Sequence, residues 1–293
     1  MIKYVNKRNI IFLFWTLVAA LMMYMPLRIL FSSTVRRDYY SHILLIPLVS
    51  GYFMYLRRKQ IFPDSGNSYG SGMTLVMVGI LLYFYGITLN PGLNQNDRSS
   101  LLIFSVLVFW VGGFILLHGT RKFRIATFPL LFLAFMIPIP SMVMDKIIYF
   151  LQVESTEVAY LLFGLTGVSV LREGFVMHLP GISIEVAEQC SGIRSSLALL
   201  ITGIVAAQFF LQSSWKNLIL IFSVIPLAVL KNGIRVVTLS LLGIYVDQRF
   251  LTEGFLHRSG GFVFFIPSLV LLGLILWLLK RTEKTGCRGS GLQ

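Results

Sequence analysis

The stretch that decides the fold is residues 188–212, EQCSGIRSSLALLITGIVAAQFFLQ, where a short polar run leads directly into a long apolar one. Residues 195–212 carry no charged side chain. A helix of roughly 20 apolar residues is long enough to cross the hydrocarbon core of a bilayer. The segment therefore predicts a membrane span that has Cys190 and Arg194 at its mouth.

The rest of the chain has the same apolar character. Of its 293 residues 56% are hydrophobic and only 13% are charged, with a mean hydropathy of +0.79. Soluble domains contain about 25% charged residues, so the composition predicts an all-α polytopic membrane protein. No repeat or linker divides the sequence, which we interpret as a single integral membrane domain over residues 1–293. The apolar runs predict eight spans, near residues 10–30, 39–56, 71–89, 101–118, 125–143, 195–212, 217–240 and 261–279.

The distribution of Lys and Arg predicts the orientation. With the N-terminus inside, the cytoplasmic segments hold 14 basic and two acidic residues, whereas the outer segments hold nine basic and ten acidic ones. Basic residues favour cytoplasmic loops. Both termini are therefore predicted to be cytoplasmic, including the tail at 280–293, and residues 144–194 are predicted to lie outside. This topology accounts for most of the net charge of +13, and we expect no nucleic-acid partner.

The small outer segment, residues 144–194, precedes the sixth predicted span. Its first part, residues 145–165, has apolar side chains at helical spacing and predicts a helix along the membrane interface. In its second part Ile182, Ile184 and Val186 alternate with polar residues, which is typical of a strand. Turn signals at 172–174 and 179–181 divide this part into short pieces. A hairpin is therefore expected to lead the chain to Cys190.

Three side chains carry the chemistry that the sequence suggests. A nearby cation and a helix N-terminus both favour the thiolate form of a cysteine such as Cys190. Arg235 lies within a predicted span and shares a helix face with Lys231; an arginine there is costly unless it is paired or hydrated, which marks it as functional. His257, before the last span, can act as a general base or acid. With the predicted topology all three emerge on one side, and together they suit acyl transfer through a thioester.

Each of the three residues also has a simpler interpretation. Cys190 is alternatively a packing residue, Arg235 an anchor that reaches to the interface, and His257 a solvated loop residue. Their coincidence at one face favours the functional interpretation. The second cysteine, Cys287, is far away, and no Cys/His cluster is present, so no disulfide framework, metal or cofactor is expected.

Two other classes of protein remain as alternatives. One is a transporter or assembly factor for exopolysaccharide export, which the missing repeat symmetry and the gathering of polar residues at one face disfavour. The other is an acyltransferase that loads lipid onto Cys190, which the outer location disfavours because acyl-CoA lies inside.

Three motifs resemble those of the exosortase/archaeosortase family. They are AEQCSGIRS at 187–195, KNGIR at 231–235 and HRSGG at 257–261. Weaker similarity is found at residues 40–42, 137–140 and 179–181, so the resemblance covers most of the chain. The histidine at position 257 resembles the bacterial branch, because arginine is usual there in the archaeal one. Gln189 departs from the pattern, since many relatives carry a small residue before the cysteine.

The resemblance implies a multi-pass cysteine protease or transpeptidase of the bacterial cytoplasmic (inner) membrane, with its active site on the outer face. Its partners would be membrane lipid and secreted proteins whose C-terminal sorting signal combines a Pro-containing motif, a transmembrane helix and a basic tail. By match, Cys190 is the nucleophile, Arg235 the catalytic arginine and His257 the third member. Secondary candidates from the same motifs are Arg194, Glu188 and Asn232.

Overall fold

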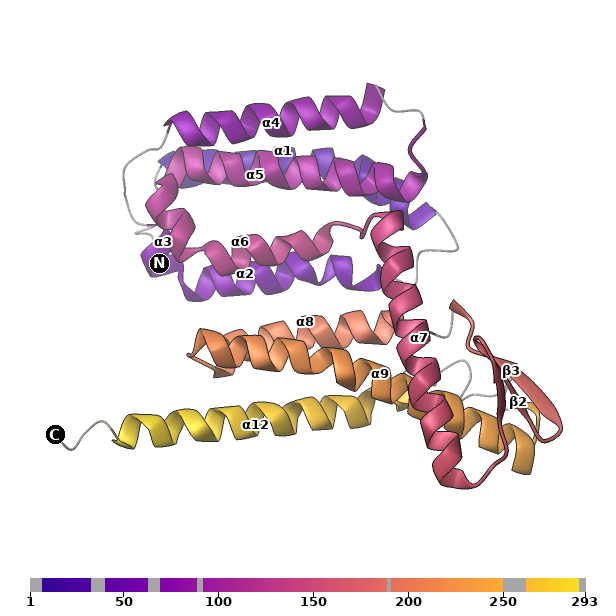
Figure 1. The fold of residues 1–293 in the computed structure, drawn as a ribbon. Coiled ribbons are helices and arrows are strands. Elements are labelled where there is room, and N and C mark those ends of the chain that lie inside the picture. Colours follow the sequence, from indigo (N-terminus) through magenta and orange to yellow (C-terminus); the bar gives the residue numbers. More distant parts are fainter. Residues whose placement is uncertain are drawn as a thin grey trace. The chain divides into compact units, whose positions relative to one another are not determined.

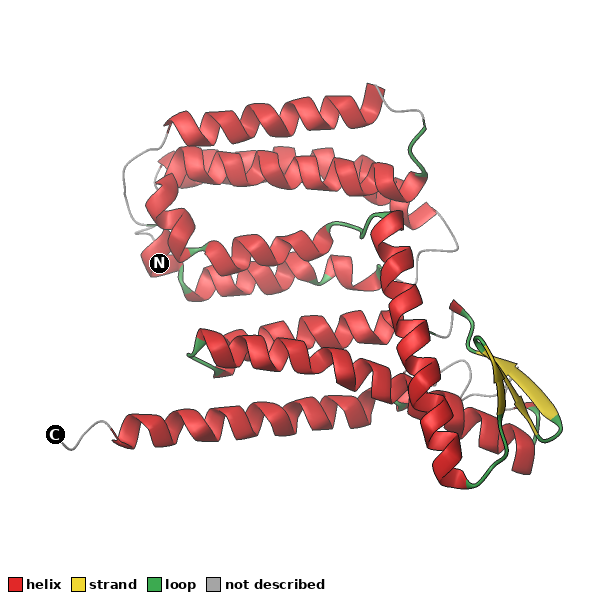
Figure 2. Cartoon of the chain, viewed as in Figure 1, coloured by secondary structure: helices red, strands yellow, loops and turns green. Residues whose placement is uncertain are grey.

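The structure is a computed structural model that describes residues 7–32, 40–62, 69–88, 92–188, 191–249 and 262–289. The chain forms two compact units, Met1–Met144 and Asp145–Gln293. Most of the described residues are helical, and one small sheet accompanies the helices (Figures 1 and 2). The predicted all-α membrane fold is therefore confirmed as a class.

The first unit is helical throughout its described residues. Its elements are α1 (Lys7–Ser32), η1 (Ser41–Leu44), α2 (Ile46–Leu56), α3 (Arg58–Ile61), α4 (Tyr69–Thr88), α5 (Gln95–Ile125), α6 (Thr127–Phe132) and η2 (Leu133–Met136). The long helix α5 packs against both α1 and α4. A Cβ atom at Gly79 of α4 would lie only 2.6 Å from the backbone nitrogen of Phe109 on α5, so this close approach requires glycine.

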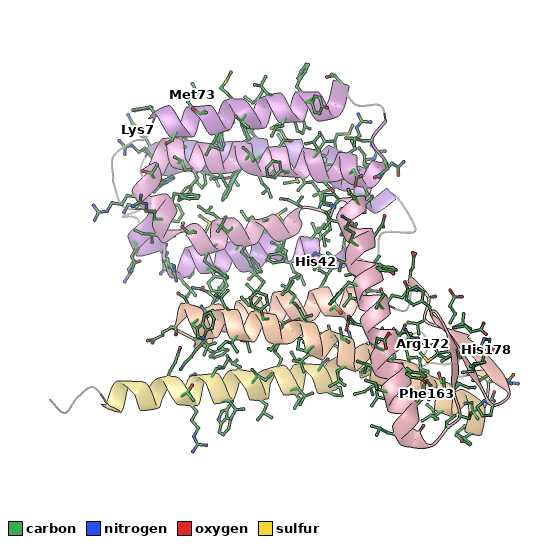
Figure 3. The ribbon with its side chains drawn as sticks, in the orientation of Figure 1. Lys7, His42, Met73, Phe163, Arg172 and His178 are labelled. Atoms are coloured by element: carbon green, nitrogen blue, oxygen red, sulfur yellow. The ribbon has the colours of Figure 1, made fainter. Side chains whose placement is uncertain are left out.

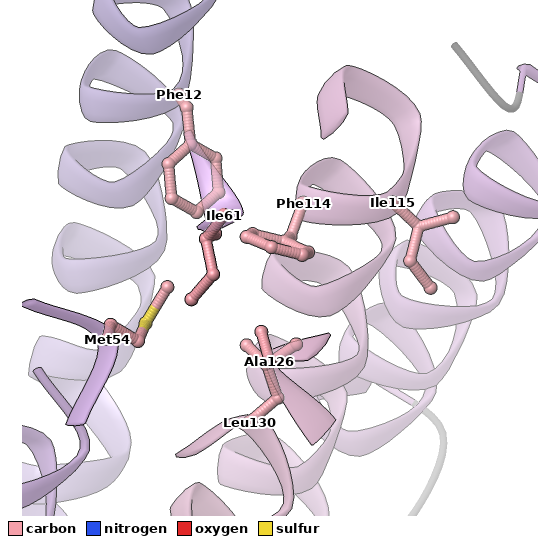
Figure 4. Packing of buried hydrophobic residues seen from close by; sticks show 7 residues of the cluster. All are labelled: Phe12, Met54, Ile61, Phe114, Ile115, Ala126 and Leu130. Atoms are coloured by element: carbon pink, nitrogen blue, oxygen red, sulfur yellow. The ribbon is translucent and has the colours of Figure 1, made fainter. Parts of the chain in front are cut away.

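One apolar cluster holds several of these helices together. Its buried members come from α1, α2, α3, α5 and α6 and the residue before α6, and they are Phe12, Met54, Ile61, Phe114, Ile115, Ala126 and Leu130 (Figure 4). Ile61 and Phe114 have no exposed surface. At about 25 cal/mol per Å² of buried apolar surface, such side chains stabilise packing by roughly 1.5–3 kcal/mol each in water. In a bilayer this term weakens, and close van der Waals packing replaces it.

The prediction of eight spans is not confirmed. Six described helices are long and apolar enough to cross a membrane, or seven if one bent pair counts as a span. The predicted span 39–56 is a shorter apolar helix, His42–Leu56. The predicted span 125–143 is interrupted after Met136, and the helices on either side of the break are bent by 88°. The sequence Ile137-Pro138-Ile139-Pro140 explains this interruption, because proline lacks the N–H that would continue a helix.

The second unit contains nearly all of the segment at 144–194 and the last three long helices that the structure describes. Helix α7 (Ser141–Thr166) starts at the end of the first unit and continues into the second. It is followed by β1 (Leu171–Glu173), β2 (Val176–Leu179), β3 (Ile182–Glu185), α8 (Ile193–Phe210), α9 (Ser214–Tyr245) and α12 (Phe265–Gly289). The helix predicted at 145–165 and the strands predicted after it are thus confirmed.

The sheet is antiparallel in the order β1-β2-β3. Gly174 and Gly181 have φ angles of 62° and 82°, and they lie at the two tight connections that the sequence predicted. As expected from their alternation, Ile182 and Ile184 are more buried than their neighbours and face an apolar cluster with Phe163 of α7 and Val237 of α9.

An ion pair also braces the sheet against α7. Arg172 of β1 contacts the Glu157 carboxylate at 2.8 Å. Figure 3 marks Phe163 on α7, and Arg172 and His178 on the sheet. The sheet is therefore fixed to α7 and to the C-terminal part of α9.

Helices α8 and α9 form an antiparallel hairpin, and α12 packs against both. Leu199, Leu220 and Leu272 come from the three helices and meet in one buried cluster. With 32 residues at 1.5 Å each, α9 is about 48 Å long. It is longer than the ~30 Å hydrocarbon core of a bilayer, and its last turns extend to the sheet.

Candidate functional site

The predicted site residues differ in how far the structure describes them. Arg235 and Asn232 lie on α9, and Arg194 lies in the first turn of α8. Glu188 is described as well, and it directly precedes the two positions 189 and 190. Cys190 and His257 lie outside the described residues, and so does Gln189. The assignment of Cys190, Arg235 and His257 as one constellation therefore stays a prediction.

The chain on both sides of Cys190 is fixed by hydrogen bonds. The amide of Gln152 on α7 donates to the Val186 carbonyl at 2.6 Å, and the Val186 N–H donates to the Phe175 carbonyl at 3.0 Å. The Ser191 N–H donates to the Glu188 carbonyl at 3.1 Å. The two described residues that flank positions 189 and 190 are thus held together, directly after a segment that α7 anchors.

Gly192 begins helix α8 in a conformation that favours glycine. Its φ is 73°, in the left-handed region, and it occupies the position before the first helical residue. A Cβ atom there would lie 2.9 Å from Oδ1 of Asn232 on α9. The backbone angle therefore favours glycine, and a side chain at this position would also have to displace the Asn232 side chain.

The carbonyl oxygen of Gly192 collects three donors. They are the Ser196 N–H at 3.0 Å, the Ser196 hydroxyl at 2.9 Å and the Ser195 hydroxyl at 3.0 Å. Gly192 has no side chain with which to cap the helix, so none of the first N–H groups of α8 is capped from that position. The positive end of the helix dipole thus lies at Gly192, two residues after Cys190 in the sequence.

The facing part of α9 is polar and buried. Asn232 is 1% exposed and Lys231 5%, and the Lys231 ammonium donates to the Ser195 hydroxyl. Gly233, which follows Asn232 in the sequence, lies against α7. A Cβ atom at Gly233 would be 2.5 Å from Val158 Cγ1. Three elements, α7, α8 and α9, therefore meet around one polar region of the second unit.

Contacts between α8 and α9 indicate where Arg235 lies on α9. Lys231 contacts Ser195 and Asn232 lies against Gly192, so α9 passes the first turn of α8 at these residues. Arg235 lies about one helical turn further along α9 than Lys231. Its side chain is partly buried.

The charge in this region is positive. Lys231 and Arg235 share one face of α9 at a spacing of four residues. Within the described ranges, neither forms an ion pair with an acidic side chain. The side chains of Glu188 and Arg194 are exposed. An anion at this place, such as a thiolate or an oxyanion, would be stabilised by both cations and by the α8 dipole.

Three residues of this region were not predicted as site residues: Lys231, Ser195 and Gln152. Lys231 carried a usable signal, because a lysine inside an apolar span is rare and usually functional. Gln152 and Ser195 carried none, since only the tertiary structure shows what they contact. The described residues contain no group of three or more His, Cys, Asp or Glu side chains that could hold a metal ion.

These features define the class of the protein as a multi-pass α-helical membrane protein with a buried, positively charged site where α7, α8 and α9 meet. A family model described as transmembrane exosortase (Exosortase_EpsH) matches residues 32–274. The chain therefore belongs to the transmembrane exosortase family. Comparison with curated proteins and comparison with solved structures each gave no significant match.

Proposed function

We propose that this protein is a cysteine transpeptidase that cleaves the C-terminal sorting signal of secreted proteins at the outer face of the bacterial cytoplasmic membrane. Family membership supports a membrane transpeptidase or protease-like role. The observation that carries the finer proposal is the positively charged region at the start of α8, where buried Lys231 contacts Ser195 and Arg235 follows about one turn further along α9. Such a region favours a thiolate at the neighbouring Cys190.

The proposed reaction has two steps. The Cys190 thiolate attacks the scissile carbonyl, and the tetrahedral oxyanion receives hydrogen bonds from Arg235, a contribution of about 3 kcal/mol for one donor. His257 gives a proton to the leaving amine, and a thioester remains on the enzyme. His257 then takes a proton from the acceptor nucleophile, which attacks the thioester and releases the Cys190 thiolate, so that the thiolate and the protonated histidine are both restored.

The bilayer supplies part of the proximity that this reaction needs. A substrate with its own transmembrane helix, a Pro-containing motif and a basic tail diffuses in the same plane as the enzyme. Its motif therefore meets Cys190 at a fixed depth, which reduces the entropic cost of bringing the reactants together. Such secreted proteins are the proposed partners, and both termini of the enzyme are proposed to be cytoplasmic.

The test is the processing of a co-expressed secreted protein with such a C-terminal signal. Cys190→Ala should leave the enzyme in the membrane but abolish conversion of precursor to product on a gel. Cys190→Ser should be nearly as inactive, because a hydroxyl is a much weaker nucleophile than a thiolate. Cys287→Ala is the matched control and should process normally. Near-normal processing by Cys190→Ala would refute covalent catalysis at this residue.

A further inference from the structure

Lys231 is a buried cation that adds to the positive charge of the site but takes no part in the two steps of the proposed reaction. It lies within α9 and is only 5% exposed. Placing a lysine inside a membrane span is costly, and such residues usually serve a function. The reaction above already uses Arg235, four residues away, as its cation. A second charge on the same helix face therefore needs its own explanation.

The donor and the acceptor can be assigned in each hydrogen bond of the Lys231–Ser195–Gly192 chain. Its ammonium group can only donate, so the Ser195 hydroxyl oxygen accepts from it. The Ser195 hydroxyl hydrogen is then directed to the Gly192 carbonyl, at 3.0 Å. This chain runs from the interior of α9 to the residue that starts α8, two positions after Cys190. Because its proton is engaged in this way, Ser195 is a link in the chain rather than a nucleophile.

We propose that Lys231 is a positioning residue for Cys190: through Ser195 it fixes the first turn of α8, and its charge favours the thiolate. This inference rests on the proposed function, because it assigns Cys190 as the reacting group. Lys231 has two proposed ways to act on that group. One is mechanical, through the Ser195–Gly192 link, and the other is electrostatic, through a low-dielectric region where charges are weakly screened.

Other charged groups on the surrounding elements limit what Lys231 alone can do. Arg235 on α9 and Arg194 on α8 have the same sign, and Glu188 before α8 has the opposite sign but is exposed. On α7, Glu154 is partly buried, while Glu157 is paired with Arg172. His257 lies outside the described residues. Because several cations can stabilise the thiolate, removing one of them should reduce the thiolate fraction of Cys190 at a given pH rather than abolish it.

The test measures how alkylation of Cys190 depends on pH. A Cys287→Ser background leaves one thiol, and iodoacetamide reacts with its thiolate form. Lys231→Met removes the charge and keeps an unbranched side chain. We expect the pH of half-maximal alkylation to rise by about one unit, which is a tenfold loss of rate at pH 7. Lys231→Arg restores a charge and should bring the midpoint back toward that of the parent.

Two further variants separate the charge from the mechanical link. Ser195→Ala breaks the link but leaves the ammonium group, so a smaller rise of the midpoint, about threefold in rate, is expected from a lost hydrogen bond. Lys216→Met is the matched control: the same substitution on the same helix, about 22 Å from Lys231 at 1.5 Å per residue. Its midpoint should equal that of the parent.

The outcomes decide between the inference and its alternatives. If Lys231→Met has the same midpoint as Lys216→Met, the inference is overturned. If Lys231→Arg and Lys231→Met raise it equally, charge is not the cause and the inference is also overturned. Should Lys231→Met fail to reach the membrane, an unchanged midpoint in Ser195→Ala overturns the inference instead.

Failure of the proposed function would look different. In that case substrate processing would continue in Cys190→Ala, whatever the alkylation midpoint of the parent enzyme. The converse result is processing that requires Cys190, with a pH of half-maximal alkylation that is the same with and without Lys231. That result would overturn only the role of Lys231.

Discussion

The position of Gly192 gives the sharpest test of how the site is built. Gly192→Ala forces an alanine into a left-handed conformation, which costs about 1–2 kcal/mol. Its Cβ atom would also lie 2.9 Å from Asn232 Oδ1, whereas ordinary contacts begin at 3.4 Å. Either α8 or Asn232 must therefore move by roughly 0.5 Å. A misplacement of about 1 Å can cost 100-fold in rate, so we expect roughly a tenfold loss.

The assay combines processing with thermal unfolding of the purified protein in detergent. Gly192→Ala should lower both the rate and the stability. Gly192→Asn should recover part of the stability, because asparagine tolerates the left-handed region, but not the rate, since its Cβ meets the same obstacle. Gly164→Ala on α7 is the control, because nothing lies within 4 Å of the added Cβ. Normal processing by Gly192→Ala would refute the argument that this close approach positions the site.

Three further predictions concern the residues around this position. Arg235→Lys keeps the charge but loses the planar fork of donors, so processing should fall at least ~100-fold at matched enzyme levels, with a smaller loss for Arg194→Lys. A fully active Arg235→Lys would reduce this residue to an anchor. A membrane-impermeant maleimide added to intact spheroplasts should label Cys190 far more than Cys287; the reverse preference would overturn the orientation. Gln152→Ala leaves a buried carbonyl without its donor and should lower the free energy of unfolding by about 1–3 kcal/mol, which thermal unfolding beside the parent protein would detect.

The sequence predicted the class of fold because hydrophobic length and the Lys/Arg bias are local properties. Its count of eight spans is not confirmed, because two apolar runs meet other constraints. The run at 39–56 has the length of a span, but its described part forms a helix of 11 residues preceded by a short 3-10 helix. Residues 125–143 contain two prolines that end a helix, and hydropathy does not detect that break.

The candidate site was predictable only in part. The motifs indicated Arg235 and Asn232, and the structure finds Asn232 in close contact with Gly192. The contribution of α7 was not predictable, because the Gln152 bond to the Val186 carbonyl joins residues 34 positions apart. Such a contact depends on the tertiary fold, and an isolated glutamine on an apolar helix carries no pattern that would reveal it.

The assembly of this region from α7, α8 and α9 has a consequence for biosynthesis. Cys190 precedes Arg235 by 45 residues, so the thiol emerges from the ribosome before α9 exists. At 5–20 residues per second, the interval lasts about 2–9 s. Under the proposed function, the cysteine has neither of the α9 cations beside it during that time and has the reactivity of an ordinary thiol. We expect its activation only when α9 has inserted and packed.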